Sequence, residues 1–555
     1  MNAWARVTTA ACTALSLAAL SACTTDAPPL TPTATGAAAE AALWWDDAVF
    51  YEVFVRSYAD SDGDGTGDLR GLISRLDHLN DGDPTTTDDL GVTGLWLMPV
   101  TQSPSYHGYD TTDYFTVEDD YGTAADFREL VTQAHARGIR VIVDLVLNHT
   151  SSLHPWFLES ASVTSSPKRD WYVWRTDNPA ATTSWGTQAW HQLNGASYLG
   201  LFWEGMPDLN HRNPEVAAEV GEITRFWLED MGVDGFRLDA VRHLIEEGDE
   251  FDDTPATHAW LARWDDSVDA VAPDALTVGE VWDATPVVAP YVIDDEVDLA
   301  FAFSLAEAII ASVRSGDPAP LDAALATTLA AFPPGQFATF LTNHDQNRVM
   351  SQLGGDVGKA RLAASLLLTL PGVPFVYYGE EIGVTGEKPD ERIRTPMQWS
   401  SEAHGGFSPT TPWQELAANW DEVNVAAQDA DPASLLNHYR RLIHLRAEHP
   451  ALRQGDLAAL PGTCTGSYAY LRSATPPDAG VADVVLVAVN VTDRERSDCA
   501  FDASGHLGPG AWEARDLIAE PGGDGVAVTT TPDGSVALGT LGPRETVILA
   551  LSPRS

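Results

Sequence analysis

The chain has 555 residues, with 80 acidic and 32 basic side chains and a formal net charge of −48. Its length allows two or three domains, and its 44% share of aliphatic and aromatic residues is normal for a globular protein. A surface this acidic repels nucleic acid and anionic lipid, which excludes both as expected partners. It suits a neutral or cationic ligand and an extracellular or saline setting, with genomic composition alone as the alternative explanation.

The first 43 residues are expected to direct and tether the protein. Arg6 precedes an Ala/Leu stretch over residues 10–20 that is too short to span a bilayer. The stretch ends at Leu20–Cys23, which resembles a bacterial lipoprotein signal with Cys23 as the lipidated residue; an ordinary secretory signal is the alternative. We expect a signal peptide over residues 1–22 and a disordered tether over residues 23–43. The protein would then be exported and anchored at the cell surface only through Cys23, or secreted.

From about residue 49 to residue 440, short apolar β runs alternate with amphipathic helical runs. Eight strands are predicted: Val49–Val55, Gly94–Val100, Arg140–Leu147, Gly235–Ala240, Leu276–Trp282, Leu299–Phe303, Phe337–Thr342 and Pro374–Tyr378. Helices are predicted between them, for example Ala125–Arg137, Pro214–Met231, Leu305–Arg314 and Gly358–Thr369. Eight βα repeats predict an α/β fold, the parallel (β/α)8 TIM barrel.

One connection, after the third strand, is far longer than the two to six residues typical of a βα loop. We therefore expect an inserted subdomain over residues 149–210, between barrel parts at residues 44–148 and 211–450. After residue 450, β runs such as Val484–Val491 and Val547–Leu551 are spaced by Gly, Pro and Asp. This pattern predicts a C-terminal antiparallel β-sandwich over residues 451–555.

Cys464 and Cys499 are the two cysteines of this predicted sandwich. In an exported β-rich domain two cysteines are expected to form one disulfide. Free buried thiols are the alternative.

Three β runs end in, or close to, a carboxylate: Asp239, Glu280 and Asp345. A carboxylate is costly to bury at a strand end, and a salt-bridged strand end explains any one of them. Three of them, each beside Arg, His or Trp, predict one site at the strand ends of a single barrel. Retaining glycoside hydrolysis needs such a set, because one ionised carboxylate attacks the anomeric carbon and a protonated one donates to the leaving oxygen.

A second constellation predicts a metal site. Asp60, Asp62, Asp64 and Asp68 occupy positions 1, 3, 5 and 9 of a loop with glycine at position 6, the ligand rhythm of an EF-hand. The bidentate acid at position 12 is missing. We expect a Ca²⁺ site of hard oxygens, with the backbone carbonyl of Thr66 contributing, and a solvated acidic turn is the alternative.

Five motifs together resemble the α-amylase family of glycoside hydrolases (family 13), and the resemblance covers nearly the whole chain after residue 44. In family order the motifs are Asp144–His149, Gly235–Asp239, Val278–Trp282 and Asn343–Asp345, with a fifth at Met206–Asn210. The resemblance implies Asp239 as the nucleophile and Glu280 as the general acid/base. Asp345 is implied to stay ionised and to stabilise the oxocarbenium-like charge.

The resemblance also implies the residues that bind the sugar. Arg237 would keep Asp239 ionised, and the ring of Tyr109 would stack on the sugar in the cleaved subsite. His149 and His344 would hydrogen-bond that sugar, with satisfied core histidines as the alternative. The remaining implied contacts come from Arg394 and from Arg242 and His243, which resemble the Lys-His pair of α-amylases.

Three features favour an α-amylase acting on α-1,4 links in starch and maltooligosaccharides over an exo-acting α-glucosidase or oligo-1,6-glucosidase. Ala240 stands where relatives specific for 1,6-links usually carry Val, Arg242 and His243 resemble the α-amylase pair, and Ser105–His107 replaces the acidic residues of exo-glucosidases. Met206–Asn210 lies between the patterns of oligo-1,6-glucosidases and neopullulanases, which indicates an intermediary group.

A non-enzymatic role like that of the heavy chains of amino-acid transporters is disfavoured. Those chains usually lack part of the catalytic set, whereas this chain keeps all three carboxylates. An α-glucan is the expected partner, and the oligomeric state stays open.

Overall fold

The computed structural model describes residues 43–553, except 178, 476–481, 508–511, 519–528 and 531–533. The predicted signal peptide, Cys23 and all but the last residue of the predicted tether lie outside the described residues. Within the described part of the chain, no helix combines the length and the apolar character needed to cross a membrane.

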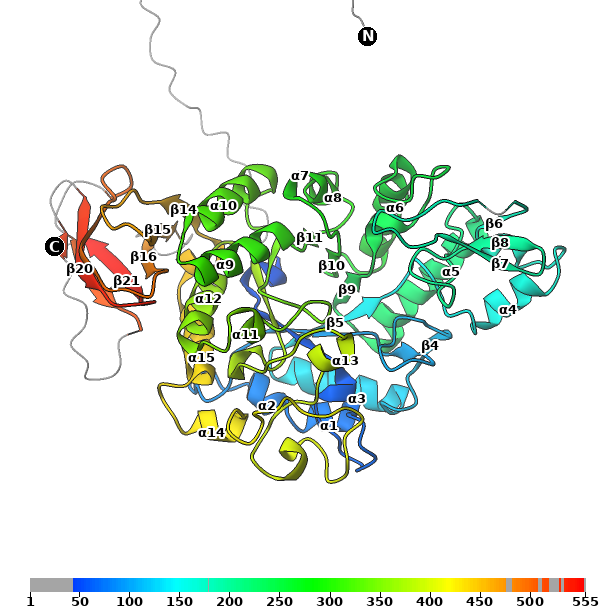
Figure 1. The fold of residues 1–555 in the computed structure, drawn as a ribbon, viewed down its shortest axis with the longest axis horizontal. Helices are drawn as coiled ribbons and strands as arrows, with labels where there is room; N and C mark the ends of the chain where they lie inside the picture. Colours follow the sequence, from blue (N-terminus) through cyan, green and yellow to red (C-terminus); the bar gives the residue numbers. More distant parts are fainter. Residues whose placement is uncertain are drawn as a thin grey trace, which may run out of the picture. The chain divides into compact units, whose positions relative to one another are not determined.

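Eight parallel strands form the barrel seen at the centre of Figure 1, one from each predicted run. In spatial order they are β11 (Leu299–Ala300), β10 (Leu276–Gly279), β9 (Gly235–Leu238), β5 (Arg140–Leu145), β2 (Gly94–Leu97), β1 (Phe50–Val53), β13 (Val373–Tyr377) and β12 (Ala338–Thr339). A parallel bridge between Phe301 and Ala338 joins the two ends of this order. The predicted (β/α)8 barrel is confirmed.

Helices follow the barrel strands and cover their outer face. The longer ones are α3 (Ala124–Ala136), α5 (Pro214–Arg225), α6 (Pro255–Val271), α9 (Phe303–Ser315), α10 (Ala319–Ala331), α12 (Val357–Thr369) and α15 (Leu435–Glu448). The short ones are α1 (Leu69–Ile73), α2 (Leu76–Leu79), α7 (Thr285–Val288), α8 (Pro290–Ile293), α11 (Val349–Gln352), α13 (Asp390–Ile393), α14 (Val425–Asp429) and α16 (Pro450–Gln454).

Helix α3 shows how sequence sets these elements. Thr123 and Asp126 form a capping box, in which each side chain accepts the other residue's backbone N–H. Phe127, Leu130 and Ala134 then fall at the i, i+3, i+7 spacing of one helix face, and all are buried. The helix therefore begins at a defined residue and presents one apolar face to the barrel.

The segment between β5 and α5 leaves the barrel and forms the teal lobe on the right of Figure 1. It contains α4 (Pro155–Ser162) and a three-stranded antiparallel sheet of β6 (Trp174–Arg175), β8 (Ala196–Leu199) and β7 (Trp190–Leu193). A separate hairpin of β3 (Thr101–Gln102) and β4 (Asp113–Val117) follows β2. Most of the tryptophans in the lobe pack in its interior, but Trp185 and Trp203 are exposed.

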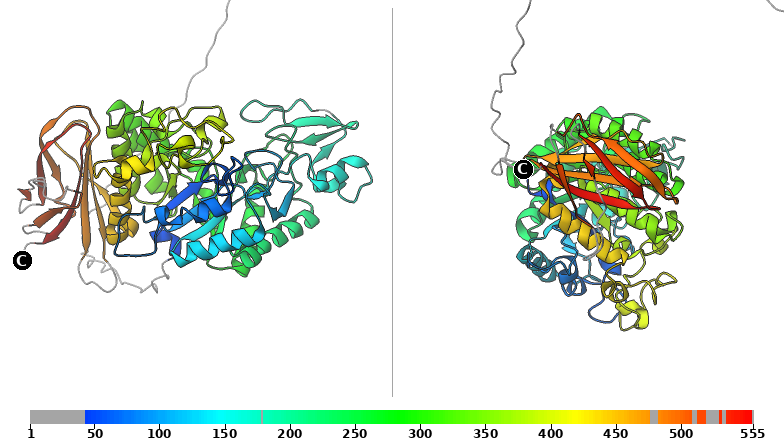
Figure 2. Two further views of the ribbon diagram at one scale, coloured as in Figure 1. Left: turned by 90° about the horizontal axis from the view of Figure 1, so that it is seen from below. Right: turned by 90° about the vertical axis from the view of Figure 1, so that its left-hand side faces the viewer.

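The C-terminal strands form two antiparallel sheets (Figure 2, right). One holds β14 (Asp456–Ala459), β15 (Ser467–Ala474), β16 (Asp483–Asn490), β21 (Thr546–Pro553) and β18 (Trp512–Asp516), and the other holds β17 (Arg496–Asp502), β20 (Ser535–Leu541) and β19 (Thr529–Thr530). A disulfide joins Cys464 to Cys499, as predicted.

Strand β16 is buried on both faces, because alternate side chains of a strand point to opposite sides. Val485 and Val487 pack into the barrel cluster, while Leu486 packs between the two C-terminal sheets. In the neighbouring strand β15, Arg472 Nη1 donates a hydrogen bond of 2.6 Å to the carbonyl oxygen of Thr369, at the end of α12. The C-terminal sheets are therefore joined to the barrel by apolar packing and by a buried hydrogen bond.

Candidate active site

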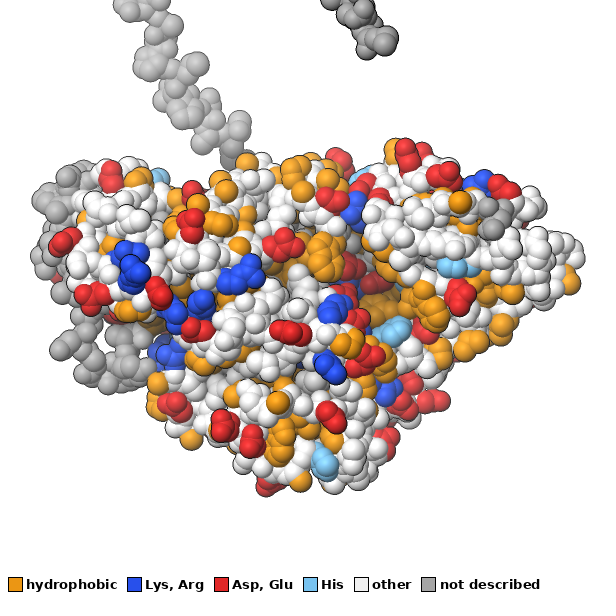
Figure 3. Space-filling model, viewed as in Figure 1, with side chains coloured by type: hydrophobic (Ala, Val, Ile, Leu, Met, Phe, Trp, Pro, Cys, Tyr) orange, Lys and Arg blue, Asp and Glu red, His pale blue; other side chains and the backbone are white. Residues whose placement is uncertain are grey.

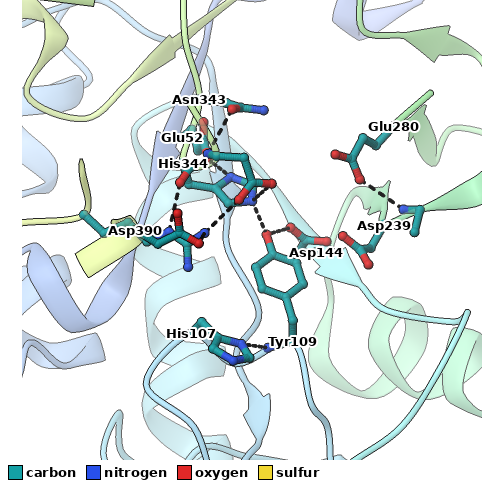
Figure 4. Close-up of polar contacts among 12 residues, drawn as sticks. Glu52, His107, Tyr109, Asp144, Asp239, Glu280, Asn343, His344 and Asp390 are labelled. Atoms are coloured by element: carbon teal, nitrogen blue, oxygen red, sulfur yellow. Dashed lines mark hydrogen bonds and ion pairs between the residues drawn. The ribbon is translucent and has the colours of Figure 1, made fainter. Parts of the chain in front are cut away.

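The ends of the parallel strands bring the three predicted carboxylates to one side of the barrel. Asp239 directly follows β9, Glu280 directly follows β10, and Asp345 lies on the segment after β12. Figure 4 shows Asp239 and Glu280 on one side of an open space, with His344 across it. Glu280 and Asp345 both line a pocket of about 720 Å³.

Arg237 holds two of these carboxylates with one guanidinium. Its Nη1 donates to Asp239 Oδ1 over 2.8 Å, and its Nη2 forms an ion pair with Glu280 Oε2, also at 2.8 Å. The same Nη1 bonds both oxygens of Asp144, at 2.7 and 2.9 Å, and the Arg237 side chain is fully buried. One guanidinium therefore holds both carboxyls close to each other, and retaining hydrolysis needs two neighbouring carboxyls.

The environments of the site push carboxyl pKa values in opposite directions. Burial and the nearby charges of Asp239 and Asp345 raise the pKa of Glu280, and Arg237 only partly opposes them. Burial also disfavours the charged form of Asp345, but His344 and Arg394 outweigh it and hold the Asp345 pKa far below its usual range. A carboxyl with a raised pKa suits an acid, and one with a lowered pKa suits a permanent negative charge.

His344 carries a positive charge at neutral pH. Burial alone would lower its pKa, but Asp345 and Glu52 raise it to about 9. The imidazolium donates from Nδ1 to Glu52 Oε1 over 2.5 Å and from Nε2 to the Tyr109 hydroxyl over 2.6 Å. That hydroxyl in turn donates to Asp144 Oδ2 over 2.9 Å, as Figure 4 shows. This chain of hydrogen bonds orients the ring of Tyr109 beside the catalytic carboxylates.

The other predicted sugar-binding residues occupy different positions around the site. Arg394 Nη2 lies 2.8 Å from Asp345 Oδ1. Arg242 and His243 line the pocket, where Arg242 Nη1 pairs with Asp283 at 2.9 Å. His149 is buried, and its Nε2 lies 3.1 Å from the carbonyl oxygen of Tyr109. Its contact with substrate stays a prediction.

The predicted metal loop gathers only part of its expected ligands. One oxygen from each of Asp60, Asp62 and Asp68 lies within 4.8 Å of the others. Asp64 is not in this group, and its Oδ1 accepts the backbone N–H of Thr66 over 2.7 Å. The calcium site stays a prediction: three of its carboxylates converge, and their hard oxygens suit a calcium ion.

The structure also identifies residues that the sequence interpretation missed. Glu52 lies in β1, is 2% exposed and pairs with His344. No neighbouring residue in the sequence indicates that pairing. Phe202 was also missed: it lines the pocket with Trp185 and Trp282, and its ring centroid lies 5.7 Å from that of Trp185. Their aromatic character was visible, but only the fold shows that they line one pocket.

Known proteins resemble this chain over most of its length. The family model "Alpha amylase, catalytic domain" matches residues 52–455. "Alpha-amylase 3" of Dictyoglomus thermophilum is 42% identical over 433 residues, covering 77% of this chain and 82% of the relative. An oligo-1,6-glucosidase of Parageobacillus thermoglucosidasius is 34% identical over 507 residues, covering 78% and 88%. The crystal structure of the α-amylase from H. orenii superposes with a TM-score of 0.79 at 40% identity, covering 91% of this chain and 99% of that one.

Proposed function

Because this chain belongs to the α-amylase family of glycoside hydrolases, we propose that it is an α-amylase that cleaves α-1,4-glucosidic bonds in starch and maltooligosaccharides with retention of configuration. The observation that carries the mechanism is the single guanidinium of Arg237, which lies 2.8 Å from both Asp239 and Glu280.

The reaction proceeds in two displacements. Asp239 attacks the anomeric carbon while Glu280 gives its proton to the departing glycosidic oxygen, which leaves a glycosyl ester on Asp239. Glu280, now ionised, takes a proton from water, the water attacks the anomeric carbon, and Asp239 is released. Asp345 keeps its negative charge beside the sugar and stabilises the oxocarbenium-like transition state.

The pocket wall beyond Glu280 supports an amylase specificity. Arg242 and His243 lie on this wall with Trp185, Phe202 and Trp282. Aromatic faces of this kind stack on sugar rings, so the wall suits an acceptor side of more than one glucose. The oligo-1,6-glucosidase relative and the Met206–Asn210 motif favour the second candidate, a 1,6-specific or exo-acting glucosidase.

Product analysis over time separates these candidates. Amylose should give a spread of short maltooligosaccharides early, and iodine staining should fall faster than reducing ends appear. Pullulan, maltotriose and isomaltose serve as parallel substrates. Glucose alone from the start, or isomaltose cut faster than maltotriose, would establish the exo-glucosidase instead.

We also propose that the loop at Asp60–Asp68 binds a structural calcium ion. Asp60, Asp62 and Asp68 would hold it, and the ion would offset the repulsion among three converging carboxylates. We assign this ion no part in the two displacements.

A further inference from the structure

A second crevice, outside the proposed active site, carries an excess of positive charge. Five basic side chains line it, and Asp493 is the acidic residue among its lining. The basic residues are Arg314, Lys359, Arg494, Arg496 and Arg544. We call this the basic crevice; its volume is about 290 Å³. Figure 3 shows Lys and Arg side chains gathered where α9 and α12 meet the C-terminal strands.

This gathering is unexpected in a chain with 80 acidic and only 32 basic residues. Like charges that crowd together repel one another, so such a cluster needs a reason. Two local preferences are broken as well. Lys359 stands in the first turn of α12, where the helix dipole disfavours a cation, and Arg544 has a φ of 56°, in the left-handed region that non-glycine residues rarely adopt.

Part of the positive charge in the crevice is balanced. Arg544 Nη1 pairs with Asp356 at 2.5 Å, and Arg496 Nε donates to Thr492 Oγ1 over 3.2 Å. Lys359 Nζ donates to the carbonyl oxygen of Arg314 over 3.1 Å, which neutralises no charge. The guanidinium groups of Arg314 and Arg494 are both exposed, and neither has an ion pair or hydrogen bond to another described residue.

Backbone contacts join the segments that line the crevice. Gly316 ends α9 in a left-handed conformation, and a β-carbon there would lie 3.5 Å from the carbonyl oxygen of Val491. The N–H of Arg544 donates to the carbonyl oxygen of Thr492 over 2.9 Å. The arginines therefore project from backbone segments that are already in place, which lowers the entropy cost of binding a ligand.

We propose that the basic crevice binds a phosphate-type dianion, either free phosphate or a phosphate monoester carried by a glucan. Guanidinium groups form paired hydrogen bonds to phosphate oxygens. Binding of free phosphate is independent of the proposed amylase activity. Only the glucan source rests on that activity, since it would let the enzyme hold a phosphorylated substrate outside the catalytic pocket.

The test uses calorimetric titration of the full-length protein with inorganic phosphate at about pH 8, where the dianion dominates. Sodium chloride keeps the ionic strength constant. The variant Arg314→Gln/Arg494→Gln should bind phosphate at least about tenfold more weakly than wild type, because two of the charged donors are lost. The control, Arg225→Gln/Arg263→Gln, removes the same formal charge from α5 and α6, where Arg225 pairs with Glu222, and should bind as wild type does.

Two further arms identify the source of the dianion. Tighter binding of phosphorylated amylopectin than of the same polymer after phosphatase treatment, lost in Arg314→Gln/Arg494→Gln, identifies the ester. Binding of inorganic phosphate with no such difference identifies the free ion. Absence of saturable phosphate binding to wild type, or equal binding to the crevice variant, overturns the proposal. Hydrolysis of unphosphorylated maltotriose, measured in parallel, should be equal in all three proteins and tests the proposed function separately.

Discussion

At the scale of single residues, Arg237 sets the geometry of the catalytic carboxylates. Its guanidinium contacts Asp144, Asp239 and Glu280 at once, and no part of its side chain reaches solvent. Removing one member of such a buried set leaves the other charges unpaired, which lowers the free energy of unfolding by about 3–5 kcal/mol. The arginine is therefore as important for placing the carboxylates as for their ionisation.

Asp239→Asn and Glu280→Gln each test a catalytic role. Both substitutions keep the side-chain volume but remove the nucleophile or the acid, so kcat on maltooligosaccharides should fall at least about 10³-fold. Thermal unfolding of each variant reports whether the fold is intact. A correctly folded variant that keeps more than about a tenth of the wild-type rate would contradict the assignment.

The raised pKa of Glu280 predicts the alkaline side of the pH profile. The acid must be protonated in the first displacement, and its pKa lies above the ordinary value of 4.5, so activity should persist above that pH and fall as pH passes the raised pKa. With maltosyl fluoride, whose leaving group needs no proton, Glu280→Gln should lose this alkaline decline. If the decline persists in that variant, another group causes it.

The site was partly predictable from single residues. Asp239, Glu280 and Asp345 stand out because charged residues at the ends of apolar runs need an explanation. Glu52 could not be found in this way, since its partner His344 is 292 positions further along the chain. His149 shows the opposite limit, because the motif identifies the residue but not the backbone carbonyl that its ring contacts.

At the scale of elements, seven of the eight barrel strands are shorter than the apolar runs that predict them. The run Gly235–Ala240 contains β9 only as far as Leu238, because the ladder stops where the chain turns to present Asp239. Ala240, beyond the ladder, is still buried, so hydrophobicity alone cannot mark the strand end. Helix α5 continues into a π-helical turn over Phe226–Met231, which hydrophobic spacing does not distinguish from one long helix.

The converging carboxylates of Asp60, Asp62 and Asp68 predict that the thermal stability of the protein depends on calcium. Ligand at 100 times its Kd stabilises the folded state by about 2.7 kcal/mol, so Tm should be higher in calcium than in excess chelator. Asp62→Ala should abolish that difference. Asp83→Ala is the matched control, because Asp83 also caps an exposed turn, through Thr85 N at 2.9 Å, but lies outside the converging group. A calcium effect that survives in Asp62→Ala would place the ion elsewhere.

At the scale of the whole molecule, we propose that Cys23 anchors the protein outside the cell. A substrate polymer too large to import would make that location useful. Fractionation of cells should find the protein in the membrane pellet, and Cys23→Ser should release it to the medium or block its processing. Equal distribution of wild type and variant between pellet and medium would contradict the anchor and leave an ordinary secretory signal.

The two-sided burial of β16 has a consequence for how the molecule comes apart. Val485 and Val487 support the barrel from one face, while Leu486 fills the sandwich from the other, so neither part can lose the strand without uncovering apolar surface. Calorimetry should therefore record one melting endotherm for both parts, and a chain cut before β14 should precipitate rather than yield a working barrel. The C-terminal strands are then a permanent component of the catalyst, and enzymes with altered specificity are better built by exchanging loops at the barrel mouth than by exchanging whole domains.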